Sequence, residues 1–231
     1  MRLDIFLVHG IGKSIGLDYY DSFVGNIRSH LPIDADINFH PIEYSHLLDA
    51  KEDKIFSWME DMGYQKIRRF ACDFVCDVLA YSYPWRPAQA GDFIFDVTEL
   101  IQTKFKEVES KYPKSTKVII GHSLGSIVGY GYTWMEKIDC LITMGSPFDY
   151  FSIRYKNFGE MNPKLRIFYN FWKRYDLVST IISRNPNFKN VHDIQVKTLN
   201  PRYLLPIQAH TSYWSSKFVY KEIAKIFKEM L

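Results

Sequence analysis

Cysteine is scarce in the sequence, and motifs that bind metals or nucleotides are missing. The 231 residues include only three cysteines, Cys72, Cys76 and Cys140, which form no C-x-x-C pair. An odd number of cysteines argues against a framework of structural disulfides. No group of His, Asp and Glu has the spacing of a metal site, and neither a G-x-G-x-x-G motif nor a P-loop occurs. We therefore expect no metal and no cofactor, and a reducing, cytoplasmic location.

Long apolar runs and an excess of one charge are also missing. The first ten residues, MRLDIFLVHG, hold an apolar run that Asp4 interrupts, which is too short for the core of a signal peptide or for a membrane span. The formal net charge is only +3, and Lys and Arg are interspersed with Asp and Glu. A surface that binds nucleic acid would need a stronger basic excess. We expect no nucleic-acid partner.

What the sequence does contain is a regular alternation of strand and helix patterns. Short runs rich in β-branched and aromatic residues predict strands at residues 2–9, 36–42, 117–121, 139–145, 164–172 and 190–199. Helical patterns lie at residues 17–31, 46–82, 92–111, 124–137 and 213–231. This alternation predicts an α/β fold, with a mostly parallel central sheet of about six strands and helices on both faces.

The segment between the second and third predicted strands is longer than the connection requires. A crossover between parallel strands needs about a dozen residues plus loops, and residues 43–113 far exceed that length. We expect one domain, residues 1–231, with a helical insertion within 43–113. Two interpretations of the part before Tyr81 stay open: it forms a cap over the site, or its helices cover one face of the sheet.

A serine stands at the corner between the third predicted strand and the helix after it. Gly121-His122-Ser123-Leu124-Gly125 matches the G-x-S-x-G motif of a nucleophile elbow, in the order strand, turn, helix that the motif requires. The two glycines are needed because a tight turn brings the backbone against these positions, where a Cβ would collide. The turn exposes the serine Oγ and places the Leu124 amide at a helix N-terminus, facing developing negative charge. Ser123 is the predicted nucleophile.

The segment FLVHGIG, residues 6–12, carries a second part of the pattern. A glycine-bounded loop after the first strand is expected beside the corner at Ser123, so that two backbone amides converge on one oxygen. Together these motifs resemble the α/β-hydrolase superfamily, nearest to its lipase and serine-esterase branch, in a form reduced at the N-terminus. The resemblance implies that Ile11 supplies an oxyanion amide beside that of Leu124. We expect His9 to brace this loop by hydrogen bonding rather than to transfer protons.

The resemblance also implies a catalytic triad in the chain order Ser, acid, His. Asp176 occupies the acid position in NFWKRYDLVS, and the departure from the family is Leu177, where proline is frequent. His210 follows the last predicted strand, in AHTSYW. In this chemistry His210 takes the proton of Ser123 as a general base, and Asp176 fixes the tautomer of the imidazole.

Other residues compete for these roles. Asp149 follows the fourth predicted strand, where some members of the family carry the acid, and Asp176 is preferred over it. His192 lies inside the last predicted strand, where we expect it to pack into the protein rather than act as the base. His122 is interpreted as a structural spacer of the elbow. Ser146 lacks a second glycine and a following helix, so it is assigned to a turn at a strand end.

The predicted activity is that of a serine hydrolase that cleaves carboxylic esters, lipid-like or small acyl esters or thioesters, through an acyl-enzyme on Ser123. The residues expected to line the pocket are mostly apolar or aromatic, which favours an acyl group: Ile11, Leu124, 81–95 and 148–155. Two alternatives remain open. One is a catalytically idle α/β-hydrolase fold that acts as a binding module, and the other is an acyltransferase that uses the same triad with an alcohol acceptor.

The C-terminal helix pattern combines an apolar stripe with a row of lysines. Four lysines alternate with apolar residues: Lys217, Lys221, Lys225 and Lys228 with Phe218, Ile223, Ile226 and Phe227. Basic amphipathic helices can bind a membrane surface. We prefer the interpretation that the apolar stripe packs on the sheet and the lysines face water. The expected partner is therefore a small-molecule acyl ester and not a membrane.

Overall fold

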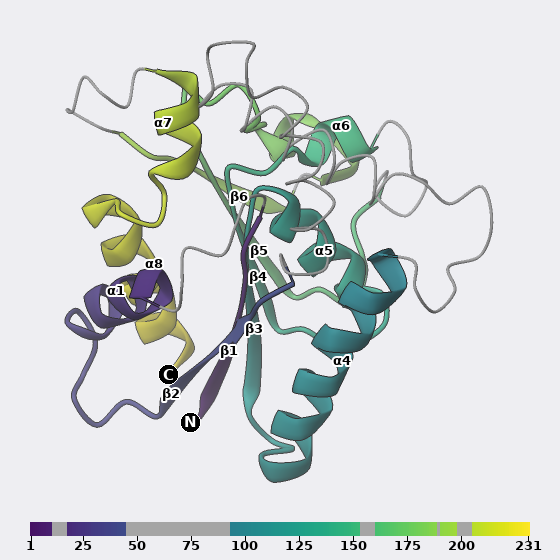
Figure 1. The fold of residues 1–231 in the computed structure, drawn as a ribbon, viewed down its shortest axis with the longest axis vertical. Coiled ribbons are helices and arrows are strands. Elements are labelled where there is room, and N and C mark those ends of the chain that lie inside the picture. Colours follow the sequence, from purple (N-terminus) through teal and green to yellow (C-terminus); the bar gives the residue numbers. More distant parts are fainter. Residues whose placement is uncertain (11–17, 45–92, 153–159, 189, 198–204) are drawn as a thin grey trace, which may run out of the picture.

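The computed structural model describes residues 1–10, 18–44, 93–152, 160–188, 190–197 and 205–231. In these residues six strands form one parallel sheet in the order β2-β1-β3-β4-β5-β6 (Figure 1). The strands are β1 (Leu3–Val8), β2 (Ile37–Ile42), β3 (Thr116–His122), β4 (Cys140–Met144), β5 (Ile167–Trp172) and β6 (Val191–Gln195). All six predicted strands are present, and the prediction of a parallel α/β fold is confirmed.

The strand ends differ from the predicted ends by a few residues. The fifth strand begins at Ile167 rather than at residue 164, because a turn at Pro163 and Lys164 precedes it. The last strand ends at Gln195 rather than at residue 199. These differences leave the order and the direction of the strands unchanged.

The central strands are buried on both faces, which explains their near-continuous apolar sequences. Every residue of β1 is buried. Successive side chains of a strand point to opposite faces. Accordingly Leu3, Ile5 and Leu7 belong to one core cluster, whereas Phe6 and Val8 belong to the other.

The outermost strand β6 behaves differently. Within the described residues it pairs only with β5, and of its five residues only Val191 is buried. His192 is exposed, with its ring centroid 5.1 Å from that of Tyr169. The prediction that His192 packs into the protein is wrong, because the edge position leaves this side of β6 open to water.

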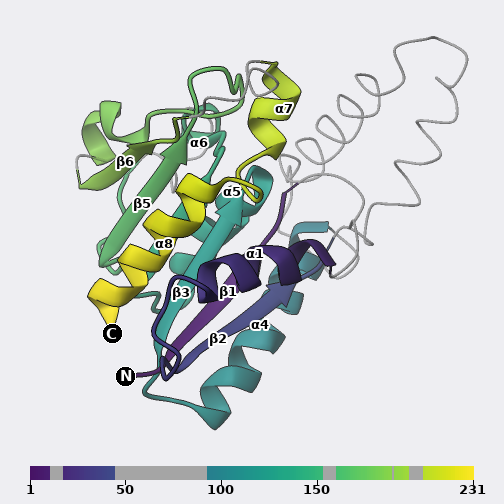
Figure 2. The ribbon, with the colours of Figure 1, turned by 90° about the vertical axis from the view of Figure 1, so that its left-hand side faces the viewer.

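Helices cover both faces of the sheet, as Figure 1 and Figure 2 show. One face carries α1 (Asp18–Arg28) and α8 (Lys217–Met230), and the other carries α4 (Phe93–Lys111) and α5 (Leu124–Thr133). Four shorter elements lie in the connections: α6 (Phe148–Ser152) after β4, η4 (Ile182–Arg184) and η5 (Pro186–Phe188) between β5 and β6, and α7 (Pro206–Thr211) after β6. Neither α6 nor α7 was expected from the sequence, since helices of five or six residues have almost no periodicity.

The C-terminal helix α8 packs its apolar stripe against the sheet. Its buried residues lie on one side: Val219, Tyr220, Ile223, Ala224, Ile226 and Phe227. Its four lysines are exposed, as the packing interpretation expects: Lys217, Lys221, Lys225 and Lys228. No helix in the described ranges is long and apolar enough to span a membrane.

Part of the predicted insertion at residues 43–113 is described, namely α4, and this helix packs on one face of the sheet. Phe105 of α4 stacks on Phe6 of β1 with ring centroids 4.3 Å apart. This helix therefore covers the sheet. Residues 45–92, including the suggested cap and the pocket residues 81–92, lie outside the described residues, so the cap stays a prediction.

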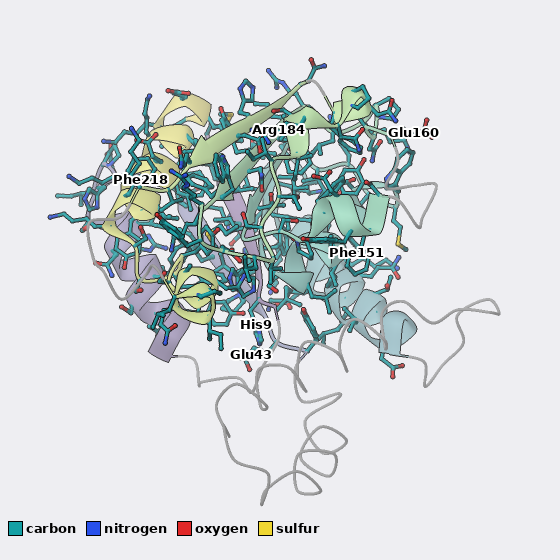
Figure 3. All side chains as sticks on the ribbon, turned by 90° about the horizontal axis from the view of Figure 1, so that it is seen from above. His9, Glu43, Phe151, Glu160, Arg184 and Phe218 are labelled. Carbon is teal, nitrogen blue, oxygen red and sulfur yellow. The ribbon has the colours of Figure 1, made fainter. Side chains whose placement is uncertain are left out.

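The register of the strands brings four chain segments to one edge of the sheet. Val8 pairs with Gly121, His122 with Met144, and Met144 with Phe171. The segments that follow β1, β3, β4 and β5 therefore leave the sheet at the same edge, which is where open α/β sheets bind ligands. Figure 3 views the molecule from this end, with Phe218 of α8 on one side and Phe151 of α6 on the other.

Candidate active site

Ser123 occupies a strained turn between β3 and α5. Its φ is 52° and its ψ is −127°, and it is the only non-glycine residue with a positive φ in the described part of the chain. This conformation is unfavourable for a residue that has a Cβ. A Cβ at Gly121 would lie 2.6 Å from the Gly125 carbonyl oxygen, and one at Gly125 would lie 2.3 Å from the Val8 carbonyl oxygen. Gly121 therefore lets the end of β3 approach the first turn of α5, and Gly125 lets α5 begin against the end of β1.

The side chains of Ser123, His210 and Asp176 form one chain of hydrogen bonds. The Ser123 Oγ lies 2.9 Å from Nε2 of His210, and Nδ1 of His210 lies 3.0 Å and 3.1 Å from the two carboxylate oxygens of Asp176. Because an ionised carboxylate only accepts hydrogen bonds, Nδ1 carries the proton, and Nε2 accepts from the serine hydroxyl. The structure thus brings together the three residues that were expected to form the triad.

The Asp176 carboxyl group is buried, with 4% of the residue exposed, and it remains ionised. Burial by itself raises the pKa of this group. Hydrogen bonds from His210, from the Val178 amide and from the Tyr213 hydroxyl outweigh burial and hold the pKa of Asp176 below its ordinary value. A charged carboxylate is therefore in place beside the imidazole at neutral pH.

His210 lies on α7, and His122 of the elbow is bonded to the same turn. The Nε2 of His122 lies 2.9 Å from the carbonyl oxygen of His210, and the two ring centroids are 4.9 Å apart. Burial, together with the nearby His210, lowers the pKa of His122 to about 3, so its ring is neutral. His122, expected to be a structural spacer, also links the nucleophile turn to the helix that carries His210.

Gly145, directly after β4, leaves room for the contact between Asp176 and His210. A Cβ at this position would lie 2.8 Å from Cε2 of Tyr213, 3.0 Å from Oδ2 of Asp176 and 3.2 Å from Nδ1 of His210. Its φ of 59° also lies in the region that favours glycine. The sequence analysis missed this role, although a glycine at the end of a buried strand often marks a close approach of backbone to other groups.

The segment after β1 packs directly against the elbow. A Cβ at Gly10 would lie 2.4 Å from the Cβ of Ser123 and 3.2 Å from the amide nitrogen of Leu124. Leu124 is the first residue of α5, where amide groups have no partner within the helix. Ile11, the other residue expected to contribute an oxyanion amide, lies outside the described residues. Of the two amides expected to bind the oxyanion, the structure therefore describes only that of Leu124, which lies beside Gly10.

His9 was expected to brace this loop by hydrogen bonding, and its ring makes one hydrogen bond, to the backbone of Gly10. Its Nε2 is buried and has no hydrogen-bond partner among the described residues. Tyr44 adds a second brace, since its hydroxyl donates to the carbonyl oxygen of His9 at 2.6 Å and its ring stacks on His9 at a centroid distance of 5.7 Å. Burial lowers the pKa of His9 to about 4, so the ring is neutral. Figure 3 labels His9 at this end of the molecule.

The competing residues take no part in the hydrogen-bonded chain. Asp149, on α6, has an Oδ1 with no hydrogen-bond partner in the described residues, and burial raises its pKa. The Oγ of Ser146 lies 2.6 Å from the Oγ of Ser126, and both are buried. No group of His, Cys, Asp and Glu able to hold a metal ion occurs in the part of the chain that the structure describes.

The fold is similar to those of solved hydrolases, at low sequence identity. A proposed hydrolase of the α/β superfamily from Xanthomonas campestris is 10% identical with a TM-score of 0.50, and the match covers 97% of this chain and 99% of that one. The esterase domain of a Rhodothermus marinus protein is 10% identical with a TM-score of 0.51, covering 97% and 85%. An esterase from Pyrococcus furiosus is 14% identical with a TM-score of 0.51, covering 99% and 83%.

These similarities and the sheet topology identify an α/β-hydrolase fold, in a reduced form with six parallel strands. At such identities the likeness concerns the fold and not the reaction. No protein-family model matches the sequence, and no curated protein is significantly similar to it.

Proposed function

We propose that the protein is a serine hydrolase that cleaves carboxylic esters through an acyl-enzyme on Ser123. The observation that carries this proposal is the continuous chain from the Ser123 Oγ through His210 to Asp176, with distances of 2.9 Å and 3.0 Å. The strained turn at Ser123 supports it, because strain of this kind persists where the surrounding structure enforces it and is often part of a mechanism.

The proposed reaction has two halves. In the first, the Ser123 Oγ attacks the ester carbonyl carbon while Nε2 of His210 takes the hydroxyl proton and then gives it to the leaving alcohol. In the second, water attacks the acyl-enzyme, His210 takes a proton from the water, and the proton returns to Ser123 as the acid leaves. Asp176 keeps Nδ1 protonated and stabilises the imidazolium that forms in each half.

The negative charge that develops on the carbonyl oxygen needs hydrogen-bond donors next to Ser123. The Leu124 amide, at the start of α5, is the proposed donor within the described residues, and the Ile11 amide is the proposed second donor. Removal of one such donor typically costs about 100- to 1,000-fold in kcat. The packing of Gly10 against Ser123 and Leu124 supports this assignment, because it leaves the segment after β1 beside the nucleophile.

The proposed substrate is a small-molecule acyl ester or thioester, with an apolar acyl group. Two structures of similar fold are described as esterases, which supports an ester as the bond cleaved. Of the described residues expected to line the pocket, Leu124, Phe148, Tyr150 and Phe151 are apolar or aromatic, and Asp149 and Ser152 are polar. Acyl groups are the ligands that such mostly apolar linings favour.

A fluorophosphonate probe tests the proposal, since it reacts with an activated serine whatever the natural substrate is. We expect labelling of the wild type, no labelling of Ser123→Ala, and a loss of about 10³- to 10⁶-fold in kcat for that variant in a series of p-nitrophenyl esters and acyl thioesters. A folded wild type that is neither labelled nor active on any ester would favour the binding module. Analysis of the products formed with and without added alcohol separates hydrolysis from acyl transfer.

A further inference from the structure

Tyr213 makes a buried contact with the triad that the proposed reaction does not yet use. Its hydroxyl donates a hydrogen bond to Oδ2 of Asp176 at 2.9 Å, and the whole residue is 0% exposed. It lies three residues after His210, beyond the end of α7. The acid and the histidine are therefore joined twice, once through the His210 ring and once through Tyr213.

The two carboxylate oxygens of Asp176 have different sets of donors. Oδ1 accepts from Nδ1 of His210 at 3.0 Å and from the amides of Val178 at 3.0 Å and Ser179 at 3.3 Å. Oδ2 accepts from Nδ1 of His210 at 3.1 Å and from the Tyr213 hydroxyl at 2.9 Å. Apart from His210, Tyr213 is the one donor to Oδ2 among the described residues. Rotation of the carboxylate away from His210 would break this bond.

Lys173 holds Tyr213 and the segment that carries His210 in place. Its Nζ donates to the Oγ of Ser212 at 2.6 Å and to the carbonyl oxygen of Ala209 at 3.2 Å, so it bonds on both sides of His210. The same Nζ lies 4.1 Å from the centroid of the Tyr213 ring, within the range of a cation–π contact. The carbonyl oxygen of Lys173 accepts from the Asp176 amide at 3.2 Å, closing the turn that carries the acid.

Lys173 is itself buried, with 4% of the residue exposed. Burial lowers its pKa to about 8, and the nearby Asp176 partly offsets that effect. The side chain therefore carries a proton and its charge at neutral pH. A buried ammonium group needs compensating partners, and the partners of Lys173 include Ala209, Ser212 and Tyr213.

We propose that Tyr213 is a positioning residue of the triad, which fixes the orientation of the Asp176 carboxylate toward His210, and that Lys173 fixes Tyr213. The proposal rests on the proposed function, because it concerns the same three residues. Orientation of the acid decides how well it holds the imidazole tautomer and stabilises the imidazolium. Small displacements of such groups have large effects on rate.

The first test compares Tyr213→Phe with Tyr130→Phe. Tyr130 is a matched control, since it is also buried and its hydroxyl bonds to the Glu160 carbonyl and the Asn162 amide, in the other core cluster. A hydrogen bond to a charged group is worth more than one between neutral groups. We expect Tyr213→Phe to lower kcat and the rate of fluorophosphonate labelling about tenfold or more, with KM within about twofold. Equal losses of rate in the two variants would overturn the proposal.

The second test measures the hydrogen bond between His210 and Asp176 without any substrate. The proton on Nδ1 of His210, bonded to a carboxylate, gives a low-field proton resonance that His210→Gln removes. We expect this resonance to move in Tyr213→Phe and to stay in place in Tyr130→Phe. If the wild type reacts with the probe and the resonance does not move in Tyr213→Phe, the positioning role fails while the proposed function stands. If the resonance moves as expected but the wild type is inert, the proposed function fails instead.

The role of Lys173 is tested by Lys173→Met, with Lys117→Met as its control. Lys117 is also buried, bonds to Glu109 and lies 5.1 Å from the centroid of the Phe105 ring, at the opposite end of β3. We expect Lys173→Met to lower the labelling rate about 2- to 10-fold and to move the same resonance, because it acts through Tyr213 and Ser212. If Lys173→Met behaves like Lys117→Met in both measurements, the role assigned to Lys173 is wrong.

Discussion

His122 donates a hydrogen bond from Nε2 to the carbonyl oxygen of His210 at 2.9 Å. The carbonyl oxygen can only accept, so Nε2 carries the proton and the ring is the neutral Nε2–H tautomer. This bond joins the residue before Ser123 to the main chain of the residue that accepts the Ser123 proton in the proposed reaction. One neutral, buried side chain thereby connects the elbow with α7.

This burial predicts a loss of stability in acid. The pKa of His122 is about 3 in the folded protein, against an ordinary value of 6.5 in the unfolded chain. Between these two values the unfolded state binds a proton that the folded state does not, so the free energy of unfolding falls as the pH falls, by about 1.4 kcal/mol per pH unit from this residue. Above pH 6.5 the contribution is constant.

The variant His122→Gln keeps a donor at the same position and cannot titrate. We expect its free energy of unfolding, measured with urea between pH 6 and pH 4, to fall less steeply than that of the wild type by about 1 kcal/mol per pH unit. The pH dependence that remains includes His9, whose pKa is lowered to about 4. Identical slopes for the two proteins would show that His122 does not stay neutral in the fold.

Gly145→Ala is expected to disturb the triad although it replaces none of the three triad residues. The added Cβ would meet the Tyr213 ring at 2.8 Å and Oδ2 of Asp176 at 3.0 Å, and alanine is disfavoured at a φ of 59°. We expect a loss of about 1 to 3 kcal/mol in unfolding free energy and about 100-fold in the labelling rate.

Gly25→Ala is the control for this substitution. Gly25 lies inside α1, and a Cβ there would have no neighbour within 4 Å. Alanine in the interior of a helix is more favourable than glycine by about 0.5 to 1 kcal/mol, so this variant should gain stability and keep its labelling rate. A Gly145→Ala protein that labels as fast as Gly25→Ala would contradict the role of Gly145.

The parts of the site that the sequence predicted are those that depend on short segments. The alternation of apolar runs located the six strands, and G-x-S-x-G located the turn at Ser123, because both patterns are local. Asp176 and His210 were expected from the resemblance to the α/β-hydrolase superfamily, whose triad has the chain order Ser, acid, His. Their distances to each other depend on the register between strands, which pairs Met144 with Phe171 and brings the loops together.

The residues that the sequence analysis missed depend on contacts between distant segments. No motif marks Lys173 or Tyr213, and the position of Gly145 after a strand does not name its partners, because these contacts appear only when β4, β5 and the segment after α7 meet. His192 was misplaced for a related reason. The periodicity of a strand does not say whether the strand lies at the edge of the sheet, and β6 does.

Substitution of the two candidate acids should separate their roles. We expect Asp176→Asn to lower kcat about 10⁴-fold, because an asparagine amide favours the wrong tautomer of His210. Asp149→Asn should keep kcat within a few fold of the wild type. Its pKa is raised by burial, so a neutral amide is a mild replacement there and should not lower the unfolding free energy. A greater loss of kcat in Asp149→Asn than in Asp176→Asn would reverse the assignment of the acid.

The strain at Ser123 can be measured by comparing two inactive variants. Ser123→Ala keeps the Cβ at a φ of 52° and ψ of −127°, whereas Ser123→Gly removes it. In an ordinary helix the change from alanine to glycine is destabilising, and Ala224→Gly in α8, at a residue 1% exposed, should cost about 1 to 2 kcal/mol. Relief of about 1 to 3 kcal/mol of backbone strain offsets that cost at position 123. We therefore expect Ser123→Gly to be at least as stable as Ser123→Ala in urea unfolding. A deficit as large as that of Ala224→Gly would mean that the turn stores no strain, and it would remove one support for a functional serine at this position.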